Sequence, residues 1–357
     1  MSTICAHDAP AWQHQAWLAN DVDEHAAHLR GWHQRYDQLT AGGFLGRLDE
    51  LTIESAQVFR EQTSQALRQR CDIRPDAVWC GITDRHDGSR IDGRLVGDGG
   101  VMVCGGAGHF ELVSPAGHDI LGVVVDRDRL LAHAAAIQVE IDGARLDPPA
   151  WLLPAAERRR RAQAKLRAVL ALAPHAAPDM DPPPLAQHTA PHTGGVAGPP
   201  VGDWARLELT LLDAVVDLLA HADEPVEGRC NAAARRRLVQ QVHEWLETHP
   251  DIVPSVPQLC ERLHVSRRTL QYAFEAETAM SPVAYLRSIR LNGVRRLLRQ
   301  GAVGSTSVRD AAAAWGFWNL SQFACDYRQQ FGERPSETLQ RSGASGFRPR
   351  VDRPATA

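Results

Sequence analysis

The C-terminal third of the chain contains the same pattern twice, at residues 256–277 and 308–332. Each copy has a short helical run with small residues, a tight turn, a polar residue suited to capping a helix, and a second helical run. Ser266 is the expected cap in the first copy and Asn319 in the second. Two short helices joined by such a turn form a helix-turn-helix unit. The sequence therefore predicts an all-α C-terminal region with two of these units.

Helical periodicity predicts which side of each second helix is buried. In the first unit Leu270, Ala273, Phe274 and Glu277 share one side, and the first three are the expected core residues; in the second unit the inward residues are Leu320, Phe323, Ala324 and Tyr327. The opposite sides carry Arg268, Gln271, Tyr272 and Glu275 in the first unit and Ser321, Gln322 and Cys325 in the second. Exposed polar side chains near a helix N-terminus are what the major groove of DNA can accept.

A connector at residues 281–301 separates the two units. Ser281 is its expected cap, Pro282 occupies the first helical position and Gly301 ends it. Such a helix spans roughly 28 Å. With a unit packed at each end, it holds the two second helices about one DNA turn apart, roughly 34 Å. Two units then let one chain read two successive major grooves.

Local charge agrees with a nucleic-acid partner, because residues 251–341 contain twelve arginines and eight acidic residues in a chain of net charge −4. Five arginines on the connector are candidates for phosphate contacts, although a solvated helix face explains each one nearly as well. They are Arg287, Arg290, Arg295, Arg296 and Arg299.

Residues 1–175 have a different pattern, in which short apolar runs alternate with Gly and Pro. Strands are expected at 78–83, 101–105, 109–113 and 119–125, and a helix at 155–173. The segment 55–70 fits either a helix or a strand leading into one. The fold class is therefore α+β, with a strand-rich N-terminal domain and the all-α C-terminal domain.

Two segments join these domains. Residues 174–202 are rich in Pro and Gly and predict a flexible linker. The apolar stripe of residues 203–222 packs against its own domain or against a second copy, and we expect a dimer helix. The predicted division is 1–175 for the regulatory domain, 174–202 for the linker, 203–228 for the helical dimerisation segment, 232–341 for the DNA-binding domain and 342–357 for a disordered tail.

Composition limits the class of protein. No segment has the length and apolar character of a signal peptide or a membrane span, and the seven cysteines form no CxxC pair, so a cytoplasmic protein without a membrane anchor is expected. A metal-dependent barrel enzyme is the rival class, but His109, Glu111 and His118 lack the HxH pair that its metal site needs. Cys80 and Cys104 fit apolar strand positions better than nucleophiles. We expect no enzyme activity.

The C-terminal motifs "VSRRTLQYAF", "SPVAYLRSIRL" and "GFWNLSQFACDYRQQFGERPSE" resemble the DNA-binding domain of the AraC/XylS transcription regulators over about a hundred residues. The resemblance implies sequence-specific binding to promoter half-sites, activation as the usual outcome, contact with RNA polymerase and a homodimer. The residues that match the family's base-contacting positions or adjoin them are Arg267, Arg268, Gln271, Tyr272, Asn319, Ser321, Gln322 and Cys325. Tyr272 and Cys325 replace residues that are often Arg in the family, and Trp318 is placed either against the DNA backbone or on its own domain.

Within this family, "HVSRRTLQYAF" and "RLNGVRR", together with "WHQRYDQLTAGGFLGRLDEL" upstream, are similar to regulators of ethanolamine-utilisation operons. This narrower resemblance implies an effector-sensing N-terminal domain, with ethanolamine and adenosylcobalamin as candidate effectors. The chain lacks a DxHxxG cobalamin motif, so no cofactor follows from the residues themselves. A regulator sensing another small amine or metabolite, a barrel enzyme fused to a DNA-binding domain, and a DNA-binding protein without an effector remain alternatives.

Overall fold

The computed structural model describes residues 12–83, 88–106, 109–147, 149–172, 201–223, 230–249, 252, 254–300 and 306–344. Most of the expected linker at 174–202 and most of the expected tail at 342–357 lie outside these residues. Among the described helices, none combines the length and apolar character that crossing a membrane would require.

Two antiparallel sheets form the N-terminal part. Sheet A, in spatial order, contains β1 (Trp12–Ala19), β3 (Gly46–Ile53), β4 (Ala56–Thr63), β11 (His118–Asp126), β6 (Ala77–Thr83), β9 (Val101–Gly105) and β12 (Ala150–Leu152). Sheet B contains β2 (His33–Gln38), β5 (Leu67–Asp72), β10 (His109–Ser114), β7 (Arg90–Ile91) and β8 (Arg94–Leu95). The four strands expected from the sequence are confirmed as β6, β9, β10 and β11.

The segment 55–70 forms β4 and most of β5, with no helix. Alternation explains this result, because side chains on a strand point to opposite faces in turn. Val58 belongs to the core under the helices, whereas Phe59 belongs to the core between the sheets. A segment buried on both faces contains no clean alternation of polar and apolar residues, so its sequence pattern is ambiguous between helix and strand.

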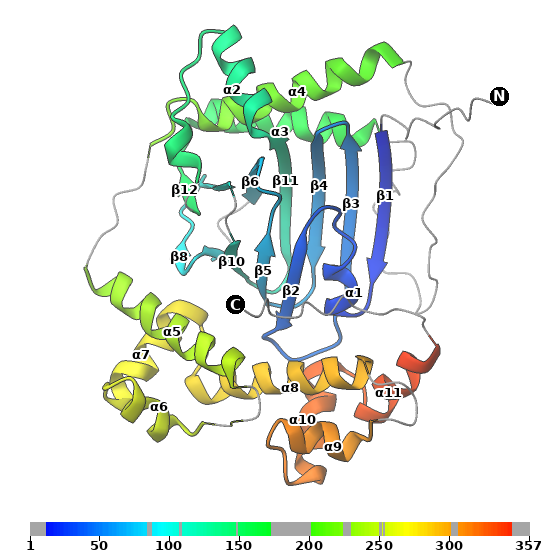
Figure 1. The fold of residues 1–357 in the computed structure, drawn as a ribbon, viewed down its shortest axis with the longest axis vertical. Coiled ribbons are helices and arrows are strands. Elements are labelled where there is room, and N and C mark those ends of the chain that lie inside the picture. The colour runs from blue at the N-terminus through cyan, green and yellow to red at the C-terminus, as the bar shows by residue number, and fades with distance from the viewer. Residues whose placement is uncertain are drawn as a thin grey trace, which may run out of the picture.

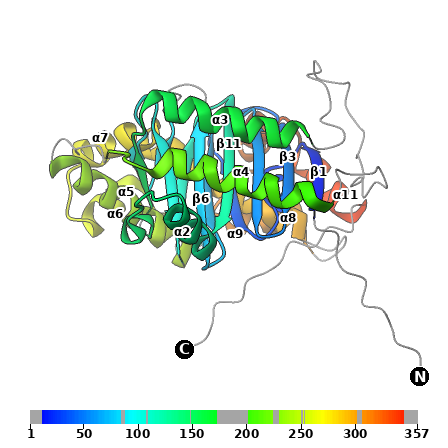
Figure 2. The ribbon, with the colours of Figure 1, turned by 90° about the horizontal axis from the view of Figure 1, so that it is seen from above.

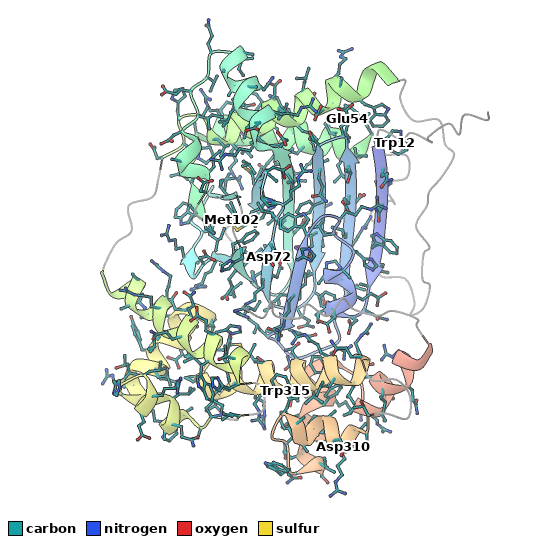
Figure 3. All side chains as sticks on the ribbon, in the orientation of Figure 1. Trp12, Glu54, Asp72, Met102, Asp310 and Trp315 are labelled. Carbon is teal, nitrogen blue, oxygen red and sulfur yellow. The ribbon has the colours of Figure 1, made fainter. Side chains whose placement is uncertain are left out.

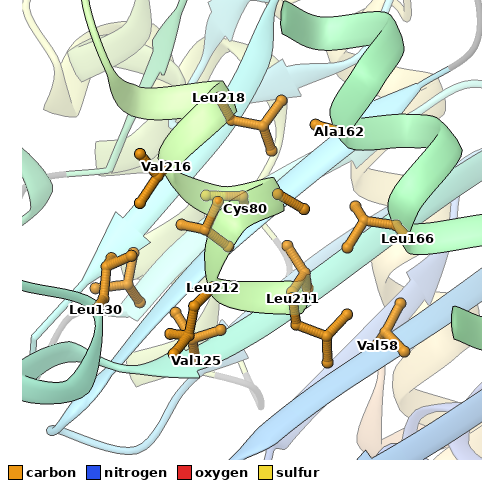
Figure 4. Packing of buried hydrophobic residues seen from close by; sticks show 14 of the residues in the cluster. Val58, Cys80, Val125, Leu130, Ala162, Leu166, Leu211, Leu212, Val216 and Leu218 are labelled. Carbon is orange, nitrogen blue, oxygen red and sulfur yellow. The ribbon is translucent and has the colours of Figure 1, made fainter. Parts of the chain in front are cut away.

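Three helices cover the outer face of sheet A: α2 (Arg127–Ala136), α3 (Ala156–Ala171) and α4 (Val201–Leu219). Figure 2 shows α3 and α4 crossing over the strands. Trp12, labelled in Figure 3, is at the start of β1. It stacks on Trp204 of α4 with ring centroids 5.0 Å apart. The apolar stripe of α4, including Leu211, Leu212 and Leu218, is buried against sheet A and α3 (Figure 4). Packing within the chain therefore accounts for the stripe that suggested a dimer helix, and this covered face is not open to a second copy.

The C-terminal region is all helix, as the sequence predicts. It contains α5 (Cys230–Thr248), α6 (Val256–Arg262), α7 (Arg267–Thr278), α8 (Pro282–Gln300), α9 (Val308–Ala314), α10 (Leu320–Phe331) and α11 (Pro335–Ala344). The first helix-turn-helix unit is α6–α7, the connector is α8 and the second unit is α9–α10. The α+β class is confirmed.

The outer face of sheet B contacts the C-terminal helices. Val113 of β10, together with Leu39 and Ala66 beside sheet B, joins the apolar core that contains Leu270 and Tyr285. The molecule is thus layered, with the α3–α4 helices over sheet A, sheet B beneath it and the C-terminal helices against sheet B (Figure 1). We call residues 12–223 of the described chain the sheet domain.

Candidate nucleic-acid interface

The first unit is built as its sequence predicts. Ser266 Oγ accepts a hydrogen bond from the Thr269 N–H at 3.0 Å, which caps α7. The turn before it contains His264, whose φ of +52° lies in the left-handed region. Leu270, Ala273 and Phe274 are fully buried. The N-terminal half of α7 is consequently left on the surface.

The second unit has the same plan with a longer turn. Asn319 Oδ1 accepts from the Gln322 N–H at 3.1 Å and caps α10. Gly316 takes the left-handed conformation that His264 takes in the first unit. Between the C-cap residue of the first helix, Trp315, and the N-cap Asn319, this turn has three residues, whereas the first turn has two between Leu263 and Ser266. Trp318 is left 81% exposed, so it does not pack on its own domain.

The buried face of α10 differs in part from the expected one. Phe323 and Tyr327 are buried as expected, whereas Leu320 is 41% exposed and Ala324 is exposed. Asp326 and Gln330 are instead buried on this face of α10. Leu320 lies in the first turn, beyond the edge of the core, and Asp326 is stabilised inside by ion pairing with Arg287 of α8 at 2.9 Å. Periodicity alone does not anticipate a paired carboxylate on the buried side.

The residues expected to contact DNA lie on two exposed helix starts. Tyr272 is 60% exposed, and Gln271 is partly exposed. The others are exposed: Arg267, Arg268, Asn319, Ser321, Gln322 and Cys325. The structure thus groups them into two sets, one at the start of α7 and one at the start of α10.

We call α7 and α10 the recognition helices, because they carry the residues expected to contact DNA. Each of them restrains a glutamine side chain in the same way. Gln322 Nε2 donates to Asp326 Oδ1 at 2.8 Å, and Gln271 Nε2 donates to Glu275 Oε1. A partner four residues later lies one helical turn away on the same face. In this arrangement the amide nitrogen of each glutamine is engaged and its carbonyl oxygen is left to accept a hydrogen bond from a base, such as the N6 amino group of adenine.

The connector arginines are mostly engaged within the protein. Arg295 and Arg296 are directed to the sheet domain, where they pair with Asp21 and Asp37. Arg290 donates to the carbonyl oxygens of Trp315 and Gly316 at 2.8 Å each. Phosphate contact is therefore the wrong interpretation for Arg290, Arg295 and Arg296. The sequence alone does not show whether an arginine side chain binds a phosphate of DNA or a carboxylate of the same chain.

The positioning roles of Gly293 and Arg290 were missed from the sequence. A Cβ at Gly293 would lie 2.2 Å from ring atoms of Trp315, so α8 and the end of α9 approach closely only because position 293 has no side chain (Figure 3 shows Trp315 beside α8). Arg290 completes this contact by binding the last carbonyls of α9 and lying 4.2 Å from the Phe317 ring centroid. The unexplained glycine inside a helical pattern was the available signal.

The metal ligands that a barrel enzyme would need are not brought together. His109 and Glu111 are on the outer face of β10, and Glu111 pairs with Arg68, whereas His118 is buried at the start of β11. Across the described residues, no cluster of three or more His, Cys, Asp or Glu is placed to hold a metal ion. Burial raises the pKa of the Cys80 and Cys104 thiols to about 12, so both stay protonated at neutral pH.

A small pocket opens at one end of the sheet domain, beside the turn between β3 and β4. Its volume is about 150 Å³, and its lining includes Trp32, Thr52, Glu54, Gln57 and Arg74. The side chains of Gln57 and Trp32 are fixed on one side of the pocket by hydrogen bonds. Gln57 Oε1 accepts from Trp32 Nε1 at 3.0 Å, and Gln57 Nε2 donates to the Glu50 carboxylate. Burial raises the pKa of Glu50, whose Oε2 finds no hydrogen-bond partner within the described part of the chain.

Comparison with known proteins identifies the C-terminal region. A family described as a helix-turn-helix domain matches residues 259–341. Regulatory protein HrpB of Ralstonia nicotianae is 32% identical over 128 residues, which cover 36% of this chain and 26% of that protein. XylDLEGF operon transcriptional activator 2 of Pseudomonas putida is 35% identical over 100 residues, covering 28% of this chain and 64% of that protein.

A solved structure is also similar to part of the chain. The crystal structure of a probable AraC family transcriptional regulator from Rhodopseudomonas palustris is 40% identical, with 30% of this chain and 97% of that chain covered and a TM-score of 0.28. The chain spans less than two thirds of the curated relatives named above. The C-terminal region of this chain therefore contains a helix-turn-helix domain, and over part of its length the chain is similar to regulatory proteins and transcriptional activators.

Proposed function

We propose that this chain is a sequence-specific DNA-binding transcriptional activator that reads two successive major grooves, one with α7 and one with α10. The observation that carries the proposal is the pair of capped helix starts, both exposed and both presenting polar side chains. In this proposal Arg268, Gln271 and Tyr272 contact one half-site and Ser321, Gln322 and Cys325 contact the other. Arg267 and Asn319 lie at the helix starts, where backbone N–H groups favour phosphates.

Selection from a random DNA library tests this function. The full chain should enrich a sequence with two half-sites, and its affinity for that sequence should fall as salt concentration rises, because phosphate contacts release counterions. Enrichment of no sequence, or affinity independent of salt, contradicts the proposal. A homodimer and contact with RNA polymerase are proposed on the family resemblance alone.

The sheet domain, which contains the described part of the expected regulatory domain at 1–175 together with α4, is proposed to sense a small molecule. The pocket beside the β3–β4 turn supports this role, since an apolar wall and a few convergent polar groups are typical of ligand sites. A molecule as small as ethanolamine fits a volume of about 150 Å³, and its ammonium group would share the Glu54 carboxylate with Arg129, whose Nη1 lies 3.4 Å from Glu54 Oε2. Adenosylcobalamin is far larger than this pocket, so no role for it there is proposed.

Calorimetry on the full chain tests the effector assignment. Ethanolamine is expected to bind, and Glu54→Gln is expected to weaken binding by removing the charge that faces the ammonium group. Glu157→Gln, on the exposed face of α3, is the matched control. Equal affinity in all three proteins contradicts the pocket as the site, and no heat with ethanolamine rejects this effector. Other small amines are tested by the same calorimetric titration.

A further inference from the structure

The sheet domain contacts both helix-turn-helix units and the connector from one side. At the connector, Asn292 Nδ2 donates to the Gln38 carbonyl oxygen at 2.9 Å, and Asn292 Oδ1 accepts from the Gln38 N–H at 3.0 Å. This side chain satisfies the last backbone groups of β2 as a neighbouring strand would. The middle of α8 is thereby fixed in position along β2.

A buried charge cluster lies next to this contact. Arg295 pairs with Asp21 at 2.8 Å and with Glu333, which directly follows the second unit, at 2.6 Å. Arg296 pairs with Asp23 at 3.3 Å and also with Asp37. Arg295 thus links the sheet domain, the connector and the segment after the second unit through one guanidinium group.

These ion pairs hold their carboxylates in the charged form. Burial raises the pKa of Asp21, but the charges of Arg295 and Arg299, with backbone N–H bonds, bring it below its ordinary value. Burial also raises the pKa of Asp37, and Arg296 is the first of the arginines that bring it well below the ordinary value. Buried charges are tolerated only when they are paired, so the cluster is compatible with one arrangement of the two domains.

The same domain contacts the C-terminal end of each recognition helix. In the first unit, Arg90 Nη2 donates to the Ala276 carbonyl oxygen near the end of α7 at 2.7 Å. In the second unit, the Gly42 N–H reaches the Gln329 and Gln330 carbonyl oxygens near the end of α10 at 3.0 Å. Gln38 Nε2 also donates to the Gln330 carbonyl oxygen at 2.7 Å.

We propose that the sheet domain is a brace that sets the spacing and rotation of the two recognition helices, so that it determines which half-site spacing the protein accepts. This inference rests on the proposed DNA-binding function. The contacts lie at the C-terminal ends of α7 and α10, whereas the DNA-facing residues Arg268 and Ser321 are at the exposed N-terminal ends. The brace therefore holds both units without covering either reading surface.

The test uses the full chain and the DNA that it selects. One or two base pairs are inserted between the half-sites. Each added base pair moves the second half-site by about 3.4 Å and turns it by about 34°. The test variant is Asp21→Asn with Asp37→Asn, which keeps side-chain shape and a capping residue for α1 (Val22–Ala26) while removing two charges from the cluster. Asp119→Asn, which removes an ion pair with Arg60 on the far side of sheet A, is the control.

The wild type and the control should lose about tenfold or more in affinity with each insertion, a loss equal to about one bidentate base contact. The double variant should bind the uninserted DNA within about threefold of wild type and lose at least about threefold less on insertion. An equal penalty in the variant overturns the brace, and tighter binding of the uninserted DNA shows an inhibitory contact instead. If circular dichroism shows that the double variant is unfolded, Arg90→Ala takes its place with the same expected results. Failure of the wild type to select any sequence contradicts the DNA-binding function itself.

Discussion

At the scale of the residue, the two recognition glutamines are each restrained by a carboxylate one turn further along the helix. Asp326 holds Gln322 and is itself paired with Arg287 of the connector, whereas Glu275 holds Gln271 at an exposed position. A restrained side chain loses less rotamer freedom when it binds a base. Gln322 is therefore expected to be the more selective of the two.

Arg268→Ala and Gln322→Ala are each expected to weaken specific binding by about 1–3 kcal/mol, the usual value of a good base contact. Their effects should fall on bases about one turn apart. Gel-shift titration with substituted half-sites measures this, and Arg160→Ala on α3 controls for loss of a distant exposed charge. If each variant weakens specific and random DNA equally, these residues position the protein without reading bases.

Gly293→Ala is expected to destabilise the C-terminal region by about 1–3 kcal/mol, because the added methyl group overlaps the Trp315 ring. Chemical denaturation of the full chain followed by tryptophan fluorescence measures the change in the free energy of unfolding. Val283→Ala, at an exposed position of the same helix, should change it by less than about 0.5 kcal/mol. A Gly293→Ala protein as stable as wild type would show that Trp315 moves aside without cost.

At the scale of the element, local sequence signals located the helices well. Caps at Ser266 and Asn319 and the helix breaker around Gly301 placed α7, α8 and α10, because these signals act within one turn. The role of α4 was not predictable, since an apolar stripe has the same pattern whether a sheet or a second copy covers it. The same limit applied to 55–70, where burial on both faces removed the alternation that marks a strand.

Asn319→Ala is expected to cost about 1 kcal/mol of stability, because the Gln322 N–H at the start of α10 loses its acceptor. Asn319→Asp keeps the cap and should leave stability nearly unchanged. The aspartate should nevertheless weaken DNA binding, since it places a negative charge where phosphates approach. Parallel thermal denaturation and gel-shift measurements separate the two effects, and unchanged DNA affinity in Asn319→Asp would place this helix start away from the backbone of DNA.

At the scale of the whole molecule, contacts between distant segments decide how the domains combine. The Asn292–Gln38 pair and the Arg295–Asp21 pair join residues more than 250 positions apart. No local pattern indicates such partners, so the sequence suggested solvated or phosphate-binding arginines on α8. A strand-rich N-terminal part and a helical C-terminal part were predictable from the sequence pattern, but the contacts that join them were not.

The charge cluster at this joint predicts a pH dependence. The pKa values of Asp21 and Asp37 are lowered in the folded protein, so their contribution to stability is present above the ordinary pKa, about 3.9, and is lost as pH falls below it. The pKa of Asp23 moves upward, because burial outweighs Arg296, and it opposes part of this effect. The stability difference between wild type and Asp21→Asn/Asp37→Asn should therefore shrink as pH falls from about 6 to about 3.

Chemical denaturation at several pH values measures this difference, with Asp128→Asn at an exposed position of α2 as the control. A difference that stays constant down to about pH 3 would mean that the two carboxylates carry no stabilising charge in the folded protein.

Hydroxyl-radical footprinting of the full chain on its selected DNA tests most directly whether two units read two successive major grooves. If α7 and α10 each read one major groove, two stretches on one face of the duplex should be protected, with their centres about 10–10.5 base pairs apart. Arg268→Ala should weaken one stretch and Gln322→Ala the other. A single protected stretch that both variants weaken equally would contradict the reading of two grooves by two units.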